Sequence, residues 1–290
     1  MTRLLPPLYV CHYTPNHERL AYLAPFLAIW EGGSCVVVKC DADESDVFSA
    51  HLGNVNNVCS WEARKNLTLR QIPVQLAHQD AIRSRKGITD HDCYLNAYLK
   101  CQSSSAQDWR LFKHLIPRTI GKSVLSLNLK HRYAYSLAAV QNQSWILVAE
   151  DDVLFEDSSC DYISEVYCRL KEAYSDLEIP VFVDIAGGCG LRARNMPQDN
   201  HFPALVMPSG TCIRRLVPTT RTTCAYLVNL AFVTRFLQVM PSPRTAIDTE
   251  ITGFMLDSLA GPDPVHCYWL EPIAFVHGSE VGRYASSVVH

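Results

Sequence analysis

Three consecutive carboxylates, Glu150, Asp151 and Asp152, directly follow an uninterrupted apolar run from Trp145 to Ala149. Such a run is typical of a strand buried on both faces of a sheet, and α/β proteins bind ligands just beyond the carboxyl ends of such strands. Because side chains alternate along a strand, we expect Glu150 and Asp152 to share one side, about 7 Å apart. Like charges at that spacing favour a cation between them, and Mn²⁺ or Mg²⁺ accepts such oxygen ligands. The alternative is a helix cap with ordinary turn acids.

The elements that must position these acids follow an α/β pattern. An apolar strand-like run covers residues 8–13, a segment with leucines every three to four residues follows, and a β-branched run covers 35–38. Strand, helix and strand in this order favour parallel pairing. We therefore expect one α/β domain over residues 1–290, built on a mostly parallel central sheet with helices on both faces. A less regular stretch is expected at about 45–120.

The segment before the acidic strand has the period of an amphipathic helix. Its apolar stripe recurs every four residues: Leu125, Leu129, Tyr133 and Leu137. This spacing predicts a helix whose opposite face carries Lys130, His131 and Arg132.

Composition excludes several classes of protein. The chain has 26 Lys+Arg against 29 Asp+Glu, a net charge of −3, and 48% hydrophobic residues. This near-neutral balance provides no field for a nucleic-acid backbone, so no nucleic-acid partner is expected. No apolar run is long enough for a transmembrane segment. The twelve cysteines include no C-x-x-C pair, which argues against a zinc site and favours reduced core thiols.

The larger pattern resembles a known enzyme family. The run from Trp145 to Phe155, after a helix containing His131, is similar to the signature region of family 25 glycosyltransferases, the lipooligosaccharide and collagen galactosyltransferases of GT-A fold. Residues 183–188 resemble the family's strand and glycines after the acidic motif, and residues 223–228 its Tyr-containing strand of small residues. Asp248 stands where the family has an acid after a Pro-rich turn.

The resemblance implies transfer of a sugar, with inversion, from a nucleotide-sugar donor to a glycan or glycoconjugate hydroxyl. UDP-hexose is the favoured donor, and the expected setting is glycan biosynthesis such as that of lipopolysaccharide. Glu150 and Asp152 would hold Mn²⁺ or Mg²⁺ on the donor diphosphate. His277 would join them, since a neutral imidazole suits Mn²⁺. An ordinary core or surface histidine is the alternative for His277.

The same resemblance calls for a base and a nucleotide slot. Asp248 is the candidate base because it opens an apolar helix, and Glu250 is its substitute. Capping of that helix is the alternative role for Asp248. The predicted donor-binding residues are mostly polar groups near strand ends: Tyr13, Thr14, Arg19, His131, Asp151 and Ser279.

Two other functions stay open. A nucleotidyltransferase also pairs acids for a metal on a nucleotide, and a glycan-binding or scaffolding relative would keep the fold without turnover. The first residues carry no secretory leader pattern, so we expect a cytoplasmic protein. Peripheral membrane attachment is compatible with this expectation. Two N-x-S/T triplets, at Asn66 and Asn142, keep the secretory-pathway lumen as an alternative. The sequence sets no oligomeric state.

Overall fold

The computed structural model describes residues 4–13, 17–30, 35–39, 122–156, 158–175, 178–188, 201–240 and 246–284. The stretch predicted to be less regular, at about 45–120, lies outside the described residues, and so does Thr14.

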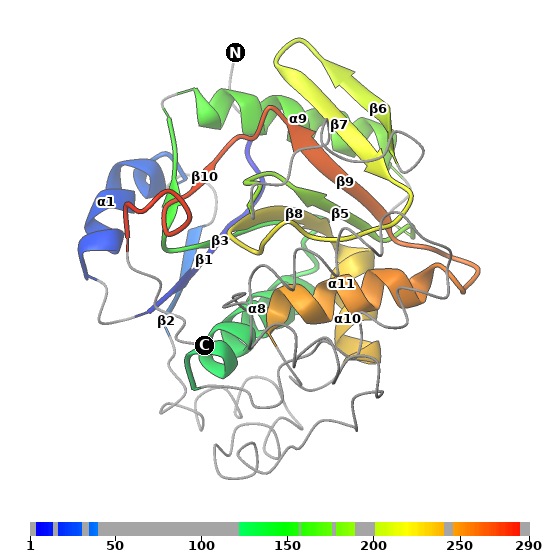
Figure 1. Ribbon diagram of the computed structural model, residues 1–290, viewed down its shortest axis with the longest axis horizontal. Coiled ribbons are helices and arrows are strands. Elements are labelled where there is room, and N and C mark those ends of the chain that lie inside the picture. Colours follow the sequence, from blue (N-terminus) through cyan, green and yellow to red (C-terminus); the bar gives the residue numbers. More distant parts are fainter. Residues whose placement is uncertain are drawn as a thin grey trace, which may run out of the picture.

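The described chain combines strands and helices, with four strands in a row from β5 to β8 (Figure 1). The strands are β1 (Leu8–His12), β2 (Cys35–Lys39), β3 (Trp145–Glu150), β4 (Val153–Leu154), β5 (Val181–Asp184), β6 (His201–Met207), β7 (Gly210–Arg215), β8 (Ala225–Asn229), β9 (His266–Glu271) and β10 (Val276–His277). The helices are α1 (His17–Ala28), α8 (Lys122–Val140), α9 (Ser159–Ala173), α10 (Leu230–Val239) and α11 (Ile247–Ser258).

Eight of these strands form one sheet in the order β2-β1-β3-β8-β5-β9-β7-β6. β1 pairs in parallel with β2 and β3, and β5 pairs in parallel with β9. β8 runs antiparallel to β3 and β5, and β7 runs antiparallel to β6 and β9. The sheet is therefore mixed, and the expectation of a mostly parallel sheet is corrected. The reason is that β8 enters the centre reversed, while the β6–β7 hairpin extends one edge.

Helices cover both faces of the sheet, as predicted (Figure 1). Along β3, Trp145, Leu147 and Ala149 pack in one core with α1 and α9. Ile146 and Val148 point the other way, into a second core with α8, α10 and α11. This alternation explains why β3 is apolar throughout, since a strand with a helix layer on each face has no solvent side.

Strand pairing brings the acidic residues to one end of β1. The parallel register sets Cys11 of β1 against Glu150 of β3, so the residues after both strands emerge side by side. The short β4 begins directly after Asp152 and pairs with β10, which sets His277 opposite Val153. Two segments far apart in the sequence are thereby held against the acidic turn.

Candidate functional site

A cavity of about 190 Å³ lies beyond the ends of β1 and β3 and against the start of α11. Most of the residues predicted for the site line it: Tyr13, Arg19, Glu150, Asp151, Asp152, Asp248 and His277. Three other predicted residues are not part of its lining: His131, Glu250 and Ser279. The strand-end location predicted from the acidic run is therefore where the structure has a cavity.

Asp151 holds the first strand against the third. Arg19 Nη1 donates to Asp151 Oδ1 at 2.7 Å, and the backbone N–H of Tyr13 donates to Oδ2 at 2.9 Å. The Nδ1 atom of His12 lies 2.9 Å from the same Oδ2. With both oxygens engaged, Asp151 fixes the position of Arg19 and of the chain after β1. The structure thus gives Asp151 a positioning role in the cavity wall that Arg19 and Tyr13 help to form.

Glu150 is held by polar groups beside the cavity. Thr223 Oγ1 donates to Glu150 Oε1 at 2.5 Å, and His131 Nε2 lies 3.6 Å from that oxygen. His131 is fully buried, with its Nδ1 2.7 Å from the Tyr226 hydroxyl. Burial opposes a charged imidazole, but the neighbouring Cys11 and Glu150 outweigh it and raise the pKa of His131. His131 therefore supports Glu150 from behind the cavity.

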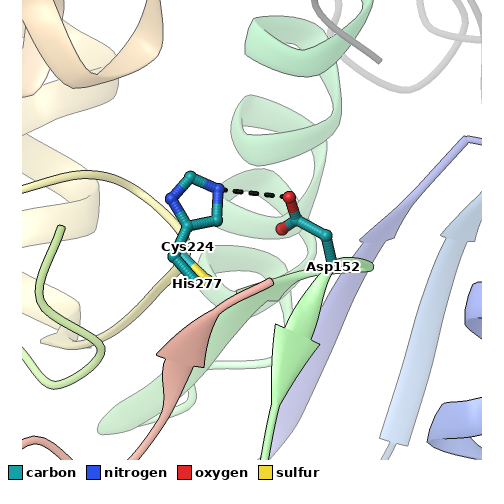
Figure 2. Close-up of side chains that lie close together, drawn as sticks. All are labelled: Asp152, Cys224 and His277. Atoms are coloured by element: carbon teal, nitrogen blue, oxygen red, sulfur yellow. Dashed lines mark hydrogen bonds and ion pairs between the residues drawn. The ribbon is translucent and has the colours of Figure 1, made fainter. Parts of the chain in front are cut away.

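Asp152, Cys224 and His277 lie close together, and we call them the metal-ligating set because their side chains are of types that can bind a metal ion (Figure 2). Asp152 Oδ2 accepts a hydrogen bond from Ser279 Oγ and lies 3.1 Å from His277 Nε2. Among the described residues, its buried Oδ1 has no hydrogen-bond partner. One donor atom each from Asp152, Cys224 and His277 lies within 4.8 Å of the other two. An orphaned carboxylate oxygen beside an imidazole and a thiol fits a divalent cation.

Of the three predicted metal ligands, the structure brings Asp152 and His277 together. The third side chain beside them is Cys224 and not the predicted Glu150. The prediction assumed that strand alternation continues through Asp152. Instead β3 ends at Glu150, and Asp151 and Asp152 form a turn. The turn directs Asp152 toward His277, while the backbone N–H of Glu150 donates to the carbonyl of Cys224 at 2.7 Å.

The close approach of Gly278 to Asp152 supplies a test of this arrangement. The Gly278 N–H donates to the Asp152 carbonyl at 2.9 Å, and a Cβ added to Gly278 would lie 2.5 Å from that oxygen. Gly278→Ala must therefore shift the chain at this contact, and we expect the shift to move the neighbouring His277 and Ser279 away from Asp152. We expect a loss of metal affinity of about 10-fold, measured by calorimetric titration.

The matched control for that change is Gly253→Ala in α11, where an added Cβ meets no atom within 4 Å. This variant should keep its metal affinity, because the change lies away from the metal-ligating set. It should also gain about 0.5–1 kcal/mol in the free energy of unfolding, since glycine weakens a helix interior. Equal metal affinities for Gly278→Ala and Gly253→Ala would show that the β10 turn does not organise the site.

The two acids in the first turn of α11 point to different surroundings. Asp248 lines the cavity and is partly exposed, and its Oδ1 accepts the backbone N–H of Thr249 at 2.7 Å. The N-cap of α11 is Ala246, so Asp248 is not the N-cap residue, although it accepts one N–H group of the first turn. Glu250 is buried and pairs with Arg132 Nη2. This pairing joins α11 to α8 and leaves Glu250 outside the cavity, so Asp248 alone keeps the geometry of a candidate base.

Glu250→Gln is therefore expected to affect folding more than chemistry. The change keeps a hydrogen-bond acceptor but leaves the buried Arg132 guanidinium without its counter-charge. We expect a loss of about 2 kcal/mol in the free energy of unfolding, measured by urea denaturation. Any catalytic activity of the chain should persist in the folded variant, and a rate loss of the size expected for a missing base would overturn this assignment.

Comparisons with known proteins provide no family assignment. No protein-family model matches the chain, and no curated protein matches it. Within the described ranges, no helix has the length and apolar character needed to cross a membrane. The family resemblance thus stays a prediction.

Among the residues that sequence reasoning missed, Lys130 and Cys224 bear most on the chemistry. Lys130 lines the cavity, is only 3% exposed, and has its ammonium 5.4 Å from the centre of the Tyr13 ring. Lys130 directly precedes His131, which was predicted for the site. The apolar stripe of the helix, however, predicted that Lys130 lies on the opposite, polar face. Cys224 gave no signal, because its neighbours in the metal-ligating set come from distant segments.

Proposed function

We propose that this chain is a glycosyltransferase of GT-A-like fold. It transfers a hexose from a nucleotide-sugar donor, UDP-hexose foremost, with inversion to a hydroxyl of a glycan or glycoconjugate in glycan biosynthesis. The observation that supports this most is a single cavity, at the ends of β1 and β3, whose lining combines Asp152 and His277 with Asp248, Arg19 and Lys130. These are the groups that a diphosphate leaving group and a hydroxyl nucleophile require.

The cavity lining contains two buried cations beside its carboxylates. Lys130 and Arg19, the latter paired with Asp151, both line it, so an anionic group that enters can contact cations in a weakly screened environment. Tyr13 lies at its rim, 41% exposed, and offers an aromatic face to a nucleobase. A divalent cation at Asp152 and His277, predicted as Mn²⁺ or Mg²⁺, would neutralise charge on the departing diphosphate when bound.

The acceptor half is the start of α11. Asp248 projects from the first turn of this helix, next to Ala246 and Ile247, which also line the cavity. A carboxylate at this position can accept the proton of the acceptor hydroxyl as that oxygen attacks the sugar. Because Ala246 and Ile247 are apolar, Asp248 is the group on this wall of the cavity that can accept a proton from an acceptor.

A ligand panel tests the proposal. UDP-, GDP- and CMP-sugars are added with Mn²⁺, Mg²⁺ or Zn²⁺ in turn, and the melting temperature of the chain is recorded, since a ligand that binds only the folded state raises it. We expect a UDP-hexose to give the largest rise. Lys130→Met should bind that donor about 10-fold more weakly, because it removes a buried cation from the cavity.

The control for the lysine change is Lys171→Met, whose ammonium lies on the exposed side of α9. This variant should bind the donor as the unmodified chain does. A panel in which no nucleotide sugar shifts the melting temperature would contradict the proposed donor site.

A further inference from the structure

Cys224 occupies an unusual position among the thiols of the described chain. It directly precedes β8, is 1% exposed, and belongs to the metal-ligating set with Asp152 and His277. The other described cysteines are also free, but none of them belongs to such a set. The position of Cys224 is fixed locally, since its backbone N–H donates to Thr222 Oγ1 at 3.3 Å.

The spacing of the three donor atoms is close to that of a coordination sphere. In a tetrahedral zinc site, metal–ligand distances of about 2.0–2.3 Å place neighbouring ligand atoms about 3.5 Å apart. The donor atoms of Asp152, Cys224 and His277 lie within 4.8 Å of one another. Movements of about 1 Å by these donor atoms, through side-chain rotation, would therefore bring all three within bonding distance of one ion. The unpartnered, buried Oδ1 of Asp152 is the second observation that indicates a missing ligand.

The chemistry of the donor set decides which ion fits. A thiolate is a soft ligand and an imidazole an intermediate one, and together they suit zinc-class ions. Mg²⁺ requires near-octahedral oxygen ligands, and Mn²⁺ likewise prefers oxygen donors. Only one of the three side chains supplies oxygen.

We infer that Asp152, Cys224 and His277 form a three-ligand site that takes Zn²⁺ in preference to Mn²⁺ or Mg²⁺. On binding, the Cys224 thiol loses its proton to solvent, and its sulfur bonds to the ion as a thiolate. Three protein ligands leave a fourth position open. Because Asp152 and His277 line the cavity, that position faces the cavity. The assignment rests on the proposed function in one respect only, namely that a donor phosphate oxygen is the group expected there.

The surrounding contacts orient the ligands as outer-shell groups do in metal sites. Ser279 Oγ donates to Asp152 Oδ2 and sets the plane of the carboxylate. The β4–β10 pairing fixes the backbone of His277, and Gly278 ties it to the carbonyl of Asp152 at 2.9 Å. Contacts of this kind hold the metal-ligating side chains in position before an ion binds.

Cobalt provides the direct test, because Co²⁺ replaces Zn²⁺ and reports its ligands through absorption. The full chain is freed of metal with a chelator and titrated with Co²⁺. We expect the bands of tetrahedral cobalt together with a thiolate-to-cobalt charge-transfer band. Zn²⁺ should remove both at one equivalent, whereas a 100-fold excess of Mn²⁺ or Mg²⁺ should leave most of both, which requires a preference of about 1,000-fold or more.

Two variants assign the band to this site. Cys224→Ser should abolish the charge-transfer band and weaken Zn²⁺ binding by about 100-fold, whereas Cys212→Ser, at a buried thiol outside the set, should leave both unchanged. His277→Gln keeps every cysteine and should also lose the band, so the test does not depend on the serine variant folding. A band retained in both Cys224→Ser and His277→Gln would overturn the assignment, and so would displacement of Co²⁺ by Mn²⁺ as readily as by Zn²⁺. No donor is present in this titration, so an absence of sugar transfer would not alter its result.

Discussion

Replacing Asp152 by Ala is expected to abolish sugar transfer and metal-dependent donor binding together. Asp152 supplies the carboxylate of the metal-ligating set, and its Oδ1 is buried without a partner among the described residues. Its removal takes away the only described oxygen ligand of that set. The rate should fall by roughly 10³ or more, because charge on the leaving diphosphate is then left without its cation.

The measurement compares donor affinity with and without a divalent cation, alongside turnover. In the unmodified chain the cation should strengthen donor binding, and in Asp152→Ala it should have no effect. Asp263→Ala is the matched control, since that aspartate is exposed and lies outside the cavity lining. Metal-dependent donor binding that survives in Asp152→Ala would remove this residue from the ligand set.

Asp248→Asn should separate chemistry from binding. The change keeps the size and the hydrogen-bond acceptor of the side chain but removes its ability to accept a proton at neutral pH. Because Asp248 lines the cavity at the start of α11, we expect kcat to fall by roughly 10² or more. The donor Kd should stay unchanged, since the metal-ligating set and the cavity cations are untouched.

The control for this variant is Asp257→Asn, an exposed position on the same helix. It should leave both kcat and donor Kd as they are. Turnover near the unmodified level in Asp248→Asn would place the base elsewhere, and a large rise in donor Kd would give Asp248 a binding role instead.

Local sequence patterns predicted most of the elements that carry the site. The apolar run from Trp145 to Ala149 predicted β3, and its acidic end predicted the position of the cavity. These predictions succeed because burial on both faces leaves a continuous apolar run in the sequence. The direction of β8 was not predictable in this way. A buried strand has the same apolar sequence pattern whether its neighbours run parallel or antiparallel to it. The mixed pairing is therefore a property of the whole sheet and not of one strand's sequence.

The polar face of α8 shows a second limit of pattern reading. Lys130, His131 and Arg132 are all buried, although the stripe that includes Leu129 predicted that they lie on the opposite, polar face. Each has a partner from a distant segment: Lys130 lies over Tyr13, His131 lies near Glu150, and Arg132 bonds to Glu250. A buried charge becomes tolerable only through such partners, and one helix does not reveal them.

The metal-ligating set shows the same limit for chemistry. Asp152 and His277 could be named as ligands from residue type and from a resemblance, but Cys224 could not. Three single residues on three segments make no spacing motif, and the absence of C-x-x-C argued against a zinc site. Only the turn after β3, the start of β8 and the β4–β10 pairing bring these donor atoms within 4.8 Å of one another.

The most direct test of the proposed function is nucleotide release. The full chain is incubated with UDP-hexoses, a divalent cation and glycan acceptors, and the free nucleotide and the new glycosidic linkage are quantified. The proposal predicts UDP release coupled to an inverted linkage in the unmodified chain, and neither product in Asp152→Ala. A folded chain that releases no nucleotide from any nucleotide sugar, or that instead releases pyrophosphate from a nucleoside triphosphate, would contradict it.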